Sequence, residues 1–131
     1  MNQLLKRLGA ITMFVEDAAR SKTFYRSVLG IEPVYEDDHS VAFDFGGTIV
    51  NLLSIAEAPS LIAPALVGDP EGGSRFQLSI FVDNTDAVVA ELAARGVKLL
   101  NGPIDRPWNM RTATFADPDG HIWEVAQQIG K

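Results

Sequence analysis

Apolar residues follow two different periods along the chain, first that of a strand and then that of a helix. Segment 8–15 is rich in β-branched and large apolar residues, which favours a strand. Four apolar residues then recur at the spacing of one helix face: Phe24, Tyr25, Val28 and Leu29. Asp17 precedes this face as a suitable N-cap, and Gly30 follows it where helices commonly end. The first quarter of the chain therefore predicts a strand followed by a helix.

The same order returns in the second half of the chain. Segment 77–82 has the pattern of a strand, and Asn84 or Thr85 is suited to cap the helix after it. That helix carries four apolar residues on one face: Val88, Val89, Leu92 and Ala93. Gly96 ends it. After each helix, apolar runs separated by turn residues predict three further strands, at 32–36, 40–45 and 48–55 and at 97–100, 111–116 and 121–127.

Short segments of the first half recur in the second in the same order. Phe14-Val15-Glu16-Asp17 matches Phe81-Val82-Asp83-Asn84 at an offset of 67, and Leu29-Gly30-Ile31 matches Arg95-Gly96-Val97 at 66. Gly47-Thr48-Ile49 matches Gly120-His121-Ile122 at 73, so the second half carries an insertion before its last strand. The repeat predicts an α+β fold of two βαβββ modules in a single domain. The modules span 8–55 and 76–128, with a linker over 56–75.

One helix covers only one face of a four-stranded sheet, so each module has a second face turned away from its helix, called the far face below. We expect the far faces to curve into a cup-like half-barrel or to pack on a partner. The linker adds four apolar residues that need cover: Leu61, Ile62, Leu66 and Val67. It is therefore a packed linker, a lid or a subunit contact.

Composition removes several classes of protein. The 131 residues include 11 Lys+Arg and 17 Asp+Glu, a formal net charge of −6, and no cysteine. Without cysteine there is no disulfide framework, thiolate nucleophile or cysteine zinc site. The basic residues are scattered, which argues against nucleic acid as a partner. No apolar run approaches the roughly 18 residues that a membrane span needs, so we expect a soluble, cytoplasmic protein without membrane contact.

Two motifs carry a resemblance to a known family. The first runs from Phe14-Val15-Glu16-Asp17 through Phe24-Tyr25-Arg26 to Val28-Leu29-Gly30, and the second is Asp117-Pro118-Asp119-Gly120-His121-Ile122-Trp123-Glu124. With the two modules, they resemble the vicinal oxygen chelate superfamily, which includes glyoxalase I, extradiol dioxygenases and bleomycin-resistance proteins. The resemblance covers about residues 8 to 128. It implies paired βαβββ modules, whereas the activities it implies range from isomerases and dioxygenases to binding proteins without catalysis.

In metal-dependent members of this superfamily, four inward positions commonly hold His, Glu or Gln. Counted onto this chain, the resemblance implies Ala10, Asn51, Gln77 and Glu124. Alanine has no donor atom, the two amides are neutral, and only Glu124 supplies charge, so this set is poorly suited to a divalent transition metal. His39 and His121 fall in turns. We therefore expect no metal site and no cofactor.

Strand parity assigns side chains to the far faces. If Ala10 and Gln77 point away from the helices, every second residue after them on the same strand does so too. The residues that alternate with these on each strand face the helix and are uniformly apolar. The expected ligand-binding residues are Thr12, Phe14, Asn51, Gln77, Ser79 and Phe81. In the inserted segment, Trp108 is suited either to stack on an aromatic ligand or to plug the cup, and Arg111 to meet an anionic ligand.

The leading hypothesis is a protein that binds a small organic molecule without a catalytic metal, in the manner of bleomycin-resistance proteins. Its net negative charge suits a cationic ligand. The alternative is an enzyme of the same superfamily, a metal- or Glu124-dependent lyase, isomerase or dioxygenase with Glu124 as general base or metal anchor. A third option is an interaction protein whose far face is filled by a partner subunit. We expect a homodimer. The ligand, and whether modules pair within one chain or across two, stay open.

Overall fold

The computed structural model describes residues 7–130, which divide by their contacts into two compact units. The first unit ends at Val67 and the second begins at Gly68, but Ser27–Leu29 belong by their contacts to the second. Each unit holds one of the two predicted modules. The boundary at 67/68 falls inside the predicted linker.

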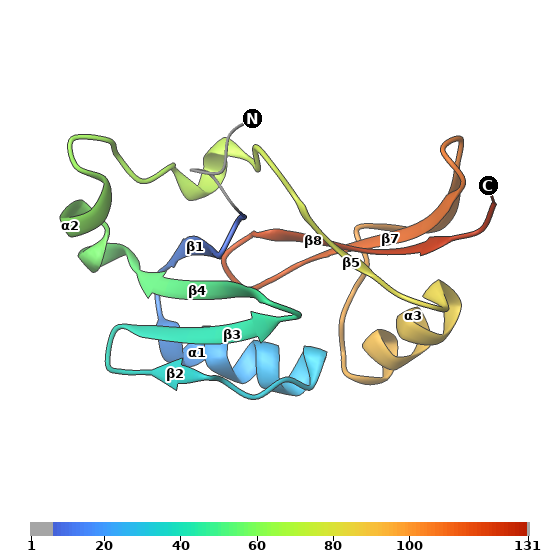
Figure 1. The fold of residues 1–131 in the computed structure, drawn as a ribbon, viewed down its shortest axis with the longest axis horizontal. Coiled ribbons are helices and arrows are strands. Elements are labelled where there is room, and N and C mark those ends of the chain that lie inside the picture. Colours follow the sequence, from blue (N-terminus) through green and yellow to red (C-terminus); the bar gives the residue numbers. More distant parts are fainter. Residues whose placement is uncertain (1–6, 131) are drawn as a thin grey trace. The chain divides into compact units, whose positions relative to one another are not determined.

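The first unit contains β1 (Ala10–Val15), α1 (Ala18–Phe24), β2 (Tyr35–Glu36), β3 (Ser40–Phe45) and β4 (Thr48–Ser54). A π-helical turn, Tyr25–Leu29, extends α1 and ends at Gly30, which adopts the left-handed conformation. The sheet order is β1-β4-β3-β2, with β1 and β4 parallel and the other pairs antiparallel (Figure 1). This is the predicted βαβββ order.

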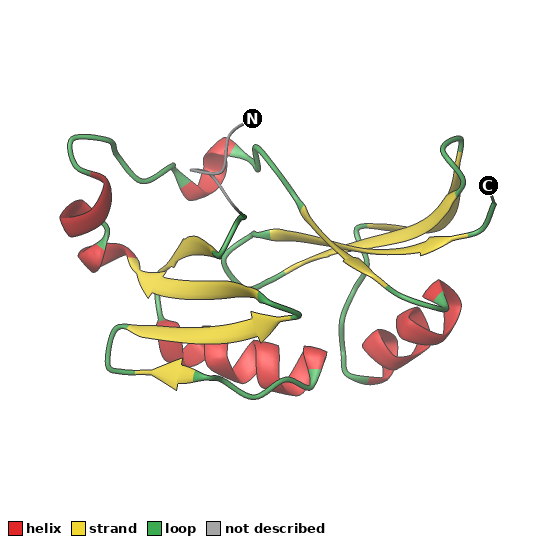
Figure 2. Cartoon of the chain, viewed as in Figure 1, coloured by secondary structure: helices red, strands yellow, loops and turns green. Residues whose placement is uncertain are grey.

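Short helical turns follow the first sheet. They are η2 (Ile55–Glu57), α2 (Pro59–Ile62) and η3 (Pro70–Gly72), shown in red along the linker in Figure 2. Pro59 and Pro64 limit the first two, because proline cannot continue a helix interior, and η3 ends at Gly73, which has a positive φ. Leu66, which we expected to need cover, is 90% exposed in the single chain.

The second unit contains β5 (Leu78–Phe81), α3 (Thr85–Ala94), β6 (Asn101–Arg106), β7 (Met110–Ala116) and β8 (Ile122–Gln128). Its sheet order, β5-β8-β7-β6, repeats that of the first unit. The α+β class and the two βαβββ modules are confirmed. One strand is displaced: β6 lies at Asn101–Arg106 and not at 97–100. The prolines at 103 and 107 disguised it, but β6 is an edge strand, where proline is tolerated.

Strand register confirms the internal repeat. Ile11 lies opposite Val50 in the first sheet, and Leu78 lies opposite Trp123 in the second. These pairs differ by 67 on the first strand and by 73 on the last, which are the offsets read from the sequence. Positions at these offsets are therefore structurally equivalent.

Alternate residues of each sheet pack against the helix of the same unit. In the first unit the largest of these sheet residues are Phe43 and Leu52, and the ring centroid of Phe43 lies 5.6 Å from that of Tyr25 on the π-helical turn. In the second unit they are Phe115, Trp123 and Val125. Burial of side chains of this size each stabilises the fold by roughly 1.5–3 kcal/mol. Trp123 is only 2% exposed and belongs to the core of this unit.

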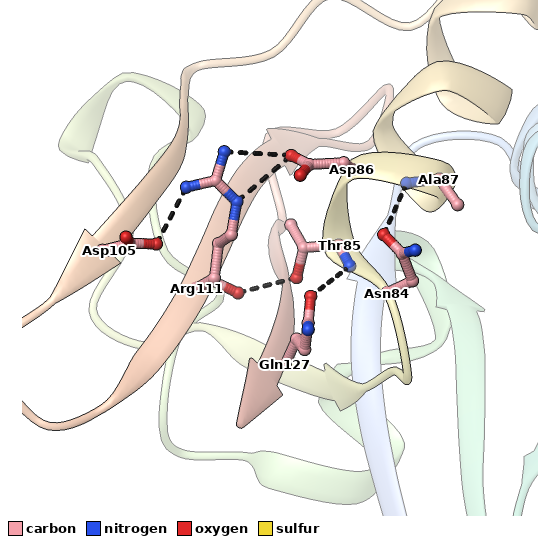
Figure 3. Close-up of polar contacts among 7 residues, drawn as sticks. All are labelled: Asn84, Thr85, Asp86, Ala87, Asp105, Arg111 and Gln127. Carbon is pink, nitrogen blue, oxygen red and sulfur yellow. Dashed lines mark hydrogen bonds and ion pairs between the residues drawn. The ribbon is translucent and has the colours of Figure 1, made fainter. Parts of the chain in front are cut away.

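Both strand-to-helix turns end in the predicted caps. Asp17 Oδ1 accepts hydrogen bonds from the backbone N–H groups of Ala19 (2.9 Å) and Arg20 (3.3 Å). Asn84 Oδ1 accepts from the Ala87 N–H at 3.0 Å (Figure 3). Such caps satisfy N–H groups that the first turn of a helix leaves free. They fix where each helix leaves its sheet.

Within residues 7–130, no helix is long and apolar enough to cross a membrane.

Candidate functional site

The far face of the second sheet brings side chains from all four strands into rows. One row runs from Phe81 through Ala126 and Thr112 to Ile104. The next runs from Ser79 through Glu124 to Thr114. Ala126, Thr112 and Thr114 are buried, whereas Phe81 is 81% exposed. A floor of small residues beside an exposed aromatic ring and a carboxylate has the composition of a ligand-binding surface.

Ser79 and Glu124 are joined by a side-chain hydrogen bond. The Ser79 hydroxyl donates to Glu124 Oε1 at 2.7 Å, across the parallel pair β5 and β8. Glu124 Oε2 accepts no hydrogen bond from any residue within the described part of the chain. The hydroxyl fixes one oxygen of the carboxylate and leaves the other for a ligand or for water. Two predicted site residues are thus in contact.

The equivalent pair in the first sheet is uncharged. Thr12 lies opposite Asn51 on the far face, at the positions that Ser79 and Glu124 occupy in the second sheet. Ala42 continues the row on β3. Phe14 lies two residues beyond Thr12 on the same side of β1, opposite Leu53. The first far face thus offers amide and hydroxyl groups but no carboxylate in this row.

The four positions implied by the metal-dependent pattern do not fit a metal ion. Ala10 is the first residue of β1 and carries only a methyl group. Gln77 immediately precedes β5 and is exposed. Asn51 and Gln77 are neutral amides, so Glu124 alone supplies negative charge. Nowhere in residues 7–130 do three or more His, Cys, Asp or Glu side chains gather into a group able to hold a metal ion.

Neither histidine is in a strand. His39 is exposed in the turn before β3, where its backbone N–H donates to Asp37 Oδ1 at 2.8 Å. His121 precedes β8, and its backbone N–H donates to Asp117 Oδ1 at 2.9 Å. Both turns are organised by an aspartate that accepts backbone N–H groups, a common property of turn residues. The backbone at each histidine is part of turn structure.

Arg111 is held in ion pairs on the opposite side of the second sheet. Its Nη1 lies 2.8 Å from Asp105 Oδ1 on β6, and its Nη2 lies 3.0 Å from Asp86 Oδ1 in the first turn of α3 (Figure 3). The hydrogen bonds that Arg111 donates to Asp105 and Asp86 raise the pKa of Arg111. This side chain ties β7 to β6 and α3. The structure does not bring it together with Ser79 and Glu124.

The backbone at Arg111 is fixed as well. The Thr85 hydroxyl donates to the Arg111 carbonyl oxygen at 2.7 Å, and the Thr85 N–H donates to Gln127 Oε1 at 2.8 Å (Figure 3). Thr85 is fully buried. These bonds join the start of α3 to β7 and β8, so contacts between the helix and the sheet hold the backbone around Arg111 in place. We therefore leave Arg111 out of the candidate site.

Trp108 lies in the hairpin turn between β6 and β7 and is 63% exposed. The ring does not pack into the core of its unit. The guanidinium carbon of Arg106 lies 6.0 Å from the ring centroid. Sequence reasoning did not select Arg106, although strand parity would have placed it on the far face with Thr112. Pro103 and Pro107 hid the strand from which that parity is counted.

The comparisons with known proteins agree with this architecture. The family model described as Glyoxalase/Bleomycin resistance protein/Dioxygenase superfamily matches residues 7–125. The chain belongs to this superfamily. The match covers both modules, and the resemblance read from the sequence is confirmed. Membership leaves activity open, because one fold carries many functions.

The similar proteins include one of about the same length as this chain and one that is longer. The uncharacterized protein YraH of Bacillus subtilis (strain 168) is 33% identical over 129 residues, covering 94% of this chain and 99% of that protein. A mitochondrial methylmalonyl-CoA epimerase of Bos taurus is 32% identical over 103 residues, or 74% of this chain and 58% of the epimerase.

Solved structures share the fold. A glyoxalase/bleomycin resistance protein/dioxygenase from Nocardioides matches with a TM-score of 0.85 at 24% identity, covering 99% of this chain and 89% of that one. A protein of unknown function from Agrobacterium tumefaciens str. C58 matches with a TM-score of 0.77 at 26% identity, covering 98% and 100%.

Proposed function

We propose that this member of the superfamily binds a small organic molecule without a catalytic metal ion. The second far face supplies the binding surface, with Phe81, Ser79 and Glu124 as contact residues. The remaining candidate contact residues are Gln77, next to the start of β5, and, on the sheet of the first unit taken by itself, Thr12, Phe14 and Asn51. The function needs affinity and shape, and no nucleophile or metal.

The observation that carries this proposal is the donor set at the four implied metal positions. A methyl group, two amides and one carboxylate give a weak set for a transition metal. The same carboxylate is positioned by Ser79 at 2.7 Å and is therefore ordered for contact with a ligand. A polar group held beside apolar side chains is the usual arrangement in small-molecule sites.

A ligand screen tests the proposal directly. Purified protein, treated with a chelator, is screened by ligand-observed NMR against a panel of small aromatic and heteroaromatic compounds. We expect binding that Phe81→Ser weakens and that Phe76→Ser, a matched change of an exposed phenylalanine outside the strands, leaves unchanged. Absence of binding by every compound would contradict the proposal. So would one tightly bound metal ion per chain that Glu124→Ala removes.

A second candidate function is proton transfer by Glu124. One oxygen of this carboxylate is held by Ser79, and the other accepts no hydrogen bond from the described residues. A positioned carboxylate with a free oxygen can act as general base. An epimerase among the relatives favours an isomerase over a lyase or a dioxygenase as the reaction class.

Solvent deuterium exchange separates the two candidates. Any compound found to bind is incubated with the protein in D₂O, and loss of its C–H signals is followed by NMR. Exchange that Glu124→Gln abolishes while the compound still binds would establish the enzyme. Binding without exchange would leave the protein a binder.

The homodimer and the cytoplasmic location stay predictions. Light scattering after size exclusion measures the first of them.

A further inference from the structure

The second module differs from the first mainly in one hairpin. Ala42 is equivalent to Thr114, because each pairs with the equivalent positions Asn51 and Glu124. Tyr35 pairs with Ala42, and Asn101 pairs with Thr114. From Tyr35 to Ala42 the chain advances by 7 residues, and from Asn101 to Thr114 by 13. The β6–β7 hairpin is therefore six residues longer than its counterpart, and the extension holds Arg106 and Trp108.

Arg106 is a cation held by neutral partners. Its Nε donates to Thr112 Oγ1 at 3.0 Å, and its Nη2 donates to Asn101 Oδ1 at 3.3 Å. Among residues 7–130 no carboxylate pairs with it, in contrast to Arg111 with its two aspartates. A guanidinium has five N–H groups. Two are used to hold it in place, which leaves three, including both on Nη1, without a described acceptor.

An exposed aromatic ring accompanies this cation. The Trp108 ring centroid lies 6.0 Å from the guanidinium carbon of Arg106. Arg106 and Ile104 share the far face with Thr112, and the row from Ile104 ends at the exposed ring of Phe81. Thr112 and Ala126, between the two ends, are small and buried. The surface thus has small buried residues between the exposed ring of Phe81 at one end and the hairpin that carries Arg106 and Trp108 at the other, and the Glu124 carboxylate lies in the next row.

Deepening the proposed function, on which this inference rests, we infer that the ligand is a planar organic carboxylate. Its carboxylate takes the free N–H groups of Arg106, whose planar fork matches a carboxylate in geometry. Its ring lies against Trp108, which is wide, flat and exposed. The net charge of −6 suits a cation at long range, but the fixed local charge at this hairpin is positive. A bound ligand contacts the hairpin directly, so its charge should complement that of Arg106 and not the net charge of the chain.

The test compares matched ligands on matched variants. A panel of aromatic and heteroaromatic carboxylates, each with its primary amide and its aminomethyl analogue, is titrated by calorimetry and by Trp emission. Wild-type protein should bind the carboxylates at least about tenfold more tightly than the paired amides. Arg106→Met should remove that preference, Arg106→Lys should restore part of it, and Arg111→Met should keep it. Trp108→Phe should remove the quenching, since the remaining tryptophan, Trp123, is buried.

Each outcome is decisive. A preference for the amines or the amides, or a carboxylate preference that survives in folded Arg106→Met protein, would overturn the inference while leaving small-molecule binding intact. Loss of the preference in Arg111→Met alone would move the anion site to Arg111 and also overturn it. Failure of every compound to bind would refute both this inference and the proposed function. Circular dichroism and a melting curve of each variant confirm that it is folded.

Discussion

Arg106 and Arg111 lie on the two strands of one hairpin, and their guanidinium groups have opposite kinds of partner. Arg111 pairs with Asp86 and Asp105, while Arg106 donates only to the neutral oxygens of Thr112 and Asn101. In register, Asp105 lies opposite Arg111 and Arg106 opposite Met110, so neighbouring positions direct the two arginines to different faces. One sheet face uses its arginine for internal pairing, and the other leaves its arginine available.

Replacing Arg111 should therefore cost stability and leave ligand affinity unchanged. Arg111→Met removes two ion pairs that link β7 to β6 and α3. We expect the melting temperature to fall by a few degrees, with a smaller fall at high salt, because salt screens pairs near the surface. Arg106→Met should melt close to wild type. An equal loss in both variants would contradict the division of roles.

Gly102 should be among the least replaceable residues of the second unit. It has a positive φ of 96°, and a Cβ there would lie 2.5 Å from the Thr112 carbonyl oxygen and 2.7 Å from Ala113 Cα. Both are backbone atoms, which cannot move aside cheaply. Gly102→Ala should destabilise the protein by more than about 3 kcal/mol in chemical unfolding. The control is Gly96→Ala, whose φ is similar but whose surroundings are open, with an expected loss of about 1–2 kcal/mol.

Ser21 and Thr85 are both fully buried, but only one hydroxyl is satisfied. The Ser21 hydroxyl has no hydrogen-bond partner among the described residues, whereas the Thr85 hydroxyl donates to the Arg111 carbonyl. Ser21→Ala should stabilise the protein by about 0.5–1 kcal/mol, since an unpaired buried polar group is removed and alanine favours the helix. Thr85→Val should destabilise it by about 1–2 kcal/mol. Denaturant titration of both variants decides, and a destabilised Ser21→Ala would refute the first expectation.

The carboxyl group of Asp37, in the turn before β3, should make the free energy of unfolding depend on pH under acidic conditions. A hydrogen bond from the backbone N–H of His39, and a further one from Tyr35, lower the pKa of Asp37. A carboxyl whose folded pKa is depressed adds stability above its unfolded pKa and loses it as pH falls through the folded pKa. Asp37→Asn should flatten this part of the curve of unfolding free energy against pH. The neighbouring Asp38→Asn removes the same charge but keeps the hydrogen bonds to Asp37, and it serves as the control.

The hydrogen bond that the Tyr35 hydroxyl donates to Asp37 Oδ2, at 2.8 Å, also raises the pKa of Tyr35. Tyr35→Phe should therefore reproduce part of the effect of Asp37→Asn on acid stability. Absorbance titration of the phenols should show one tyrosine ionising at lower pH in Asp37→Asn than in wild type. Identical titrations of the two proteins would contradict the assigned cause.

Most of the fold could be predicted because its signals are local or repeated. The caps at Asp17 and Asn84, the alternation of Met13 and Val15 with Thr12 and Phe14, and the offsets of 67 and 73 are all visible in the sequence. The caps and the alternation reflect short-range rules of helix and strand geometry, and the offsets reflect the repeat. Strand parity also placed Ser79 on the far face to which the resemblance assigned Glu124, but the hydrogen bond between the two was not predicted.

The site was less predictable where the two modules differ. No repeat constrains the β6–β7 hairpin, and its prolines broke the strand pattern from which parity is counted. Arg111 was selected for its charge, but side-chain partners such as Asp86 come from a helix 25 residues away. Such pairing is a tertiary property, which one sequence does not display. Arg106 escaped selection for the same reason, because its neutral partners became visible only with the strands in register.

The register that relates the two sheets also sets an expectation for stoichiometry. If both copies of the module were chemically alike, each chain would offer two equivalent places for a ligand. The copies differ at the row where Asn51 stands in for Glu124, and at the hairpin where the first module lacks six residues. The two modules keep the same backbone arrangement but differ in the side chains available to contact a ligand. Titration of this protein should accordingly saturate at one molecule per chain.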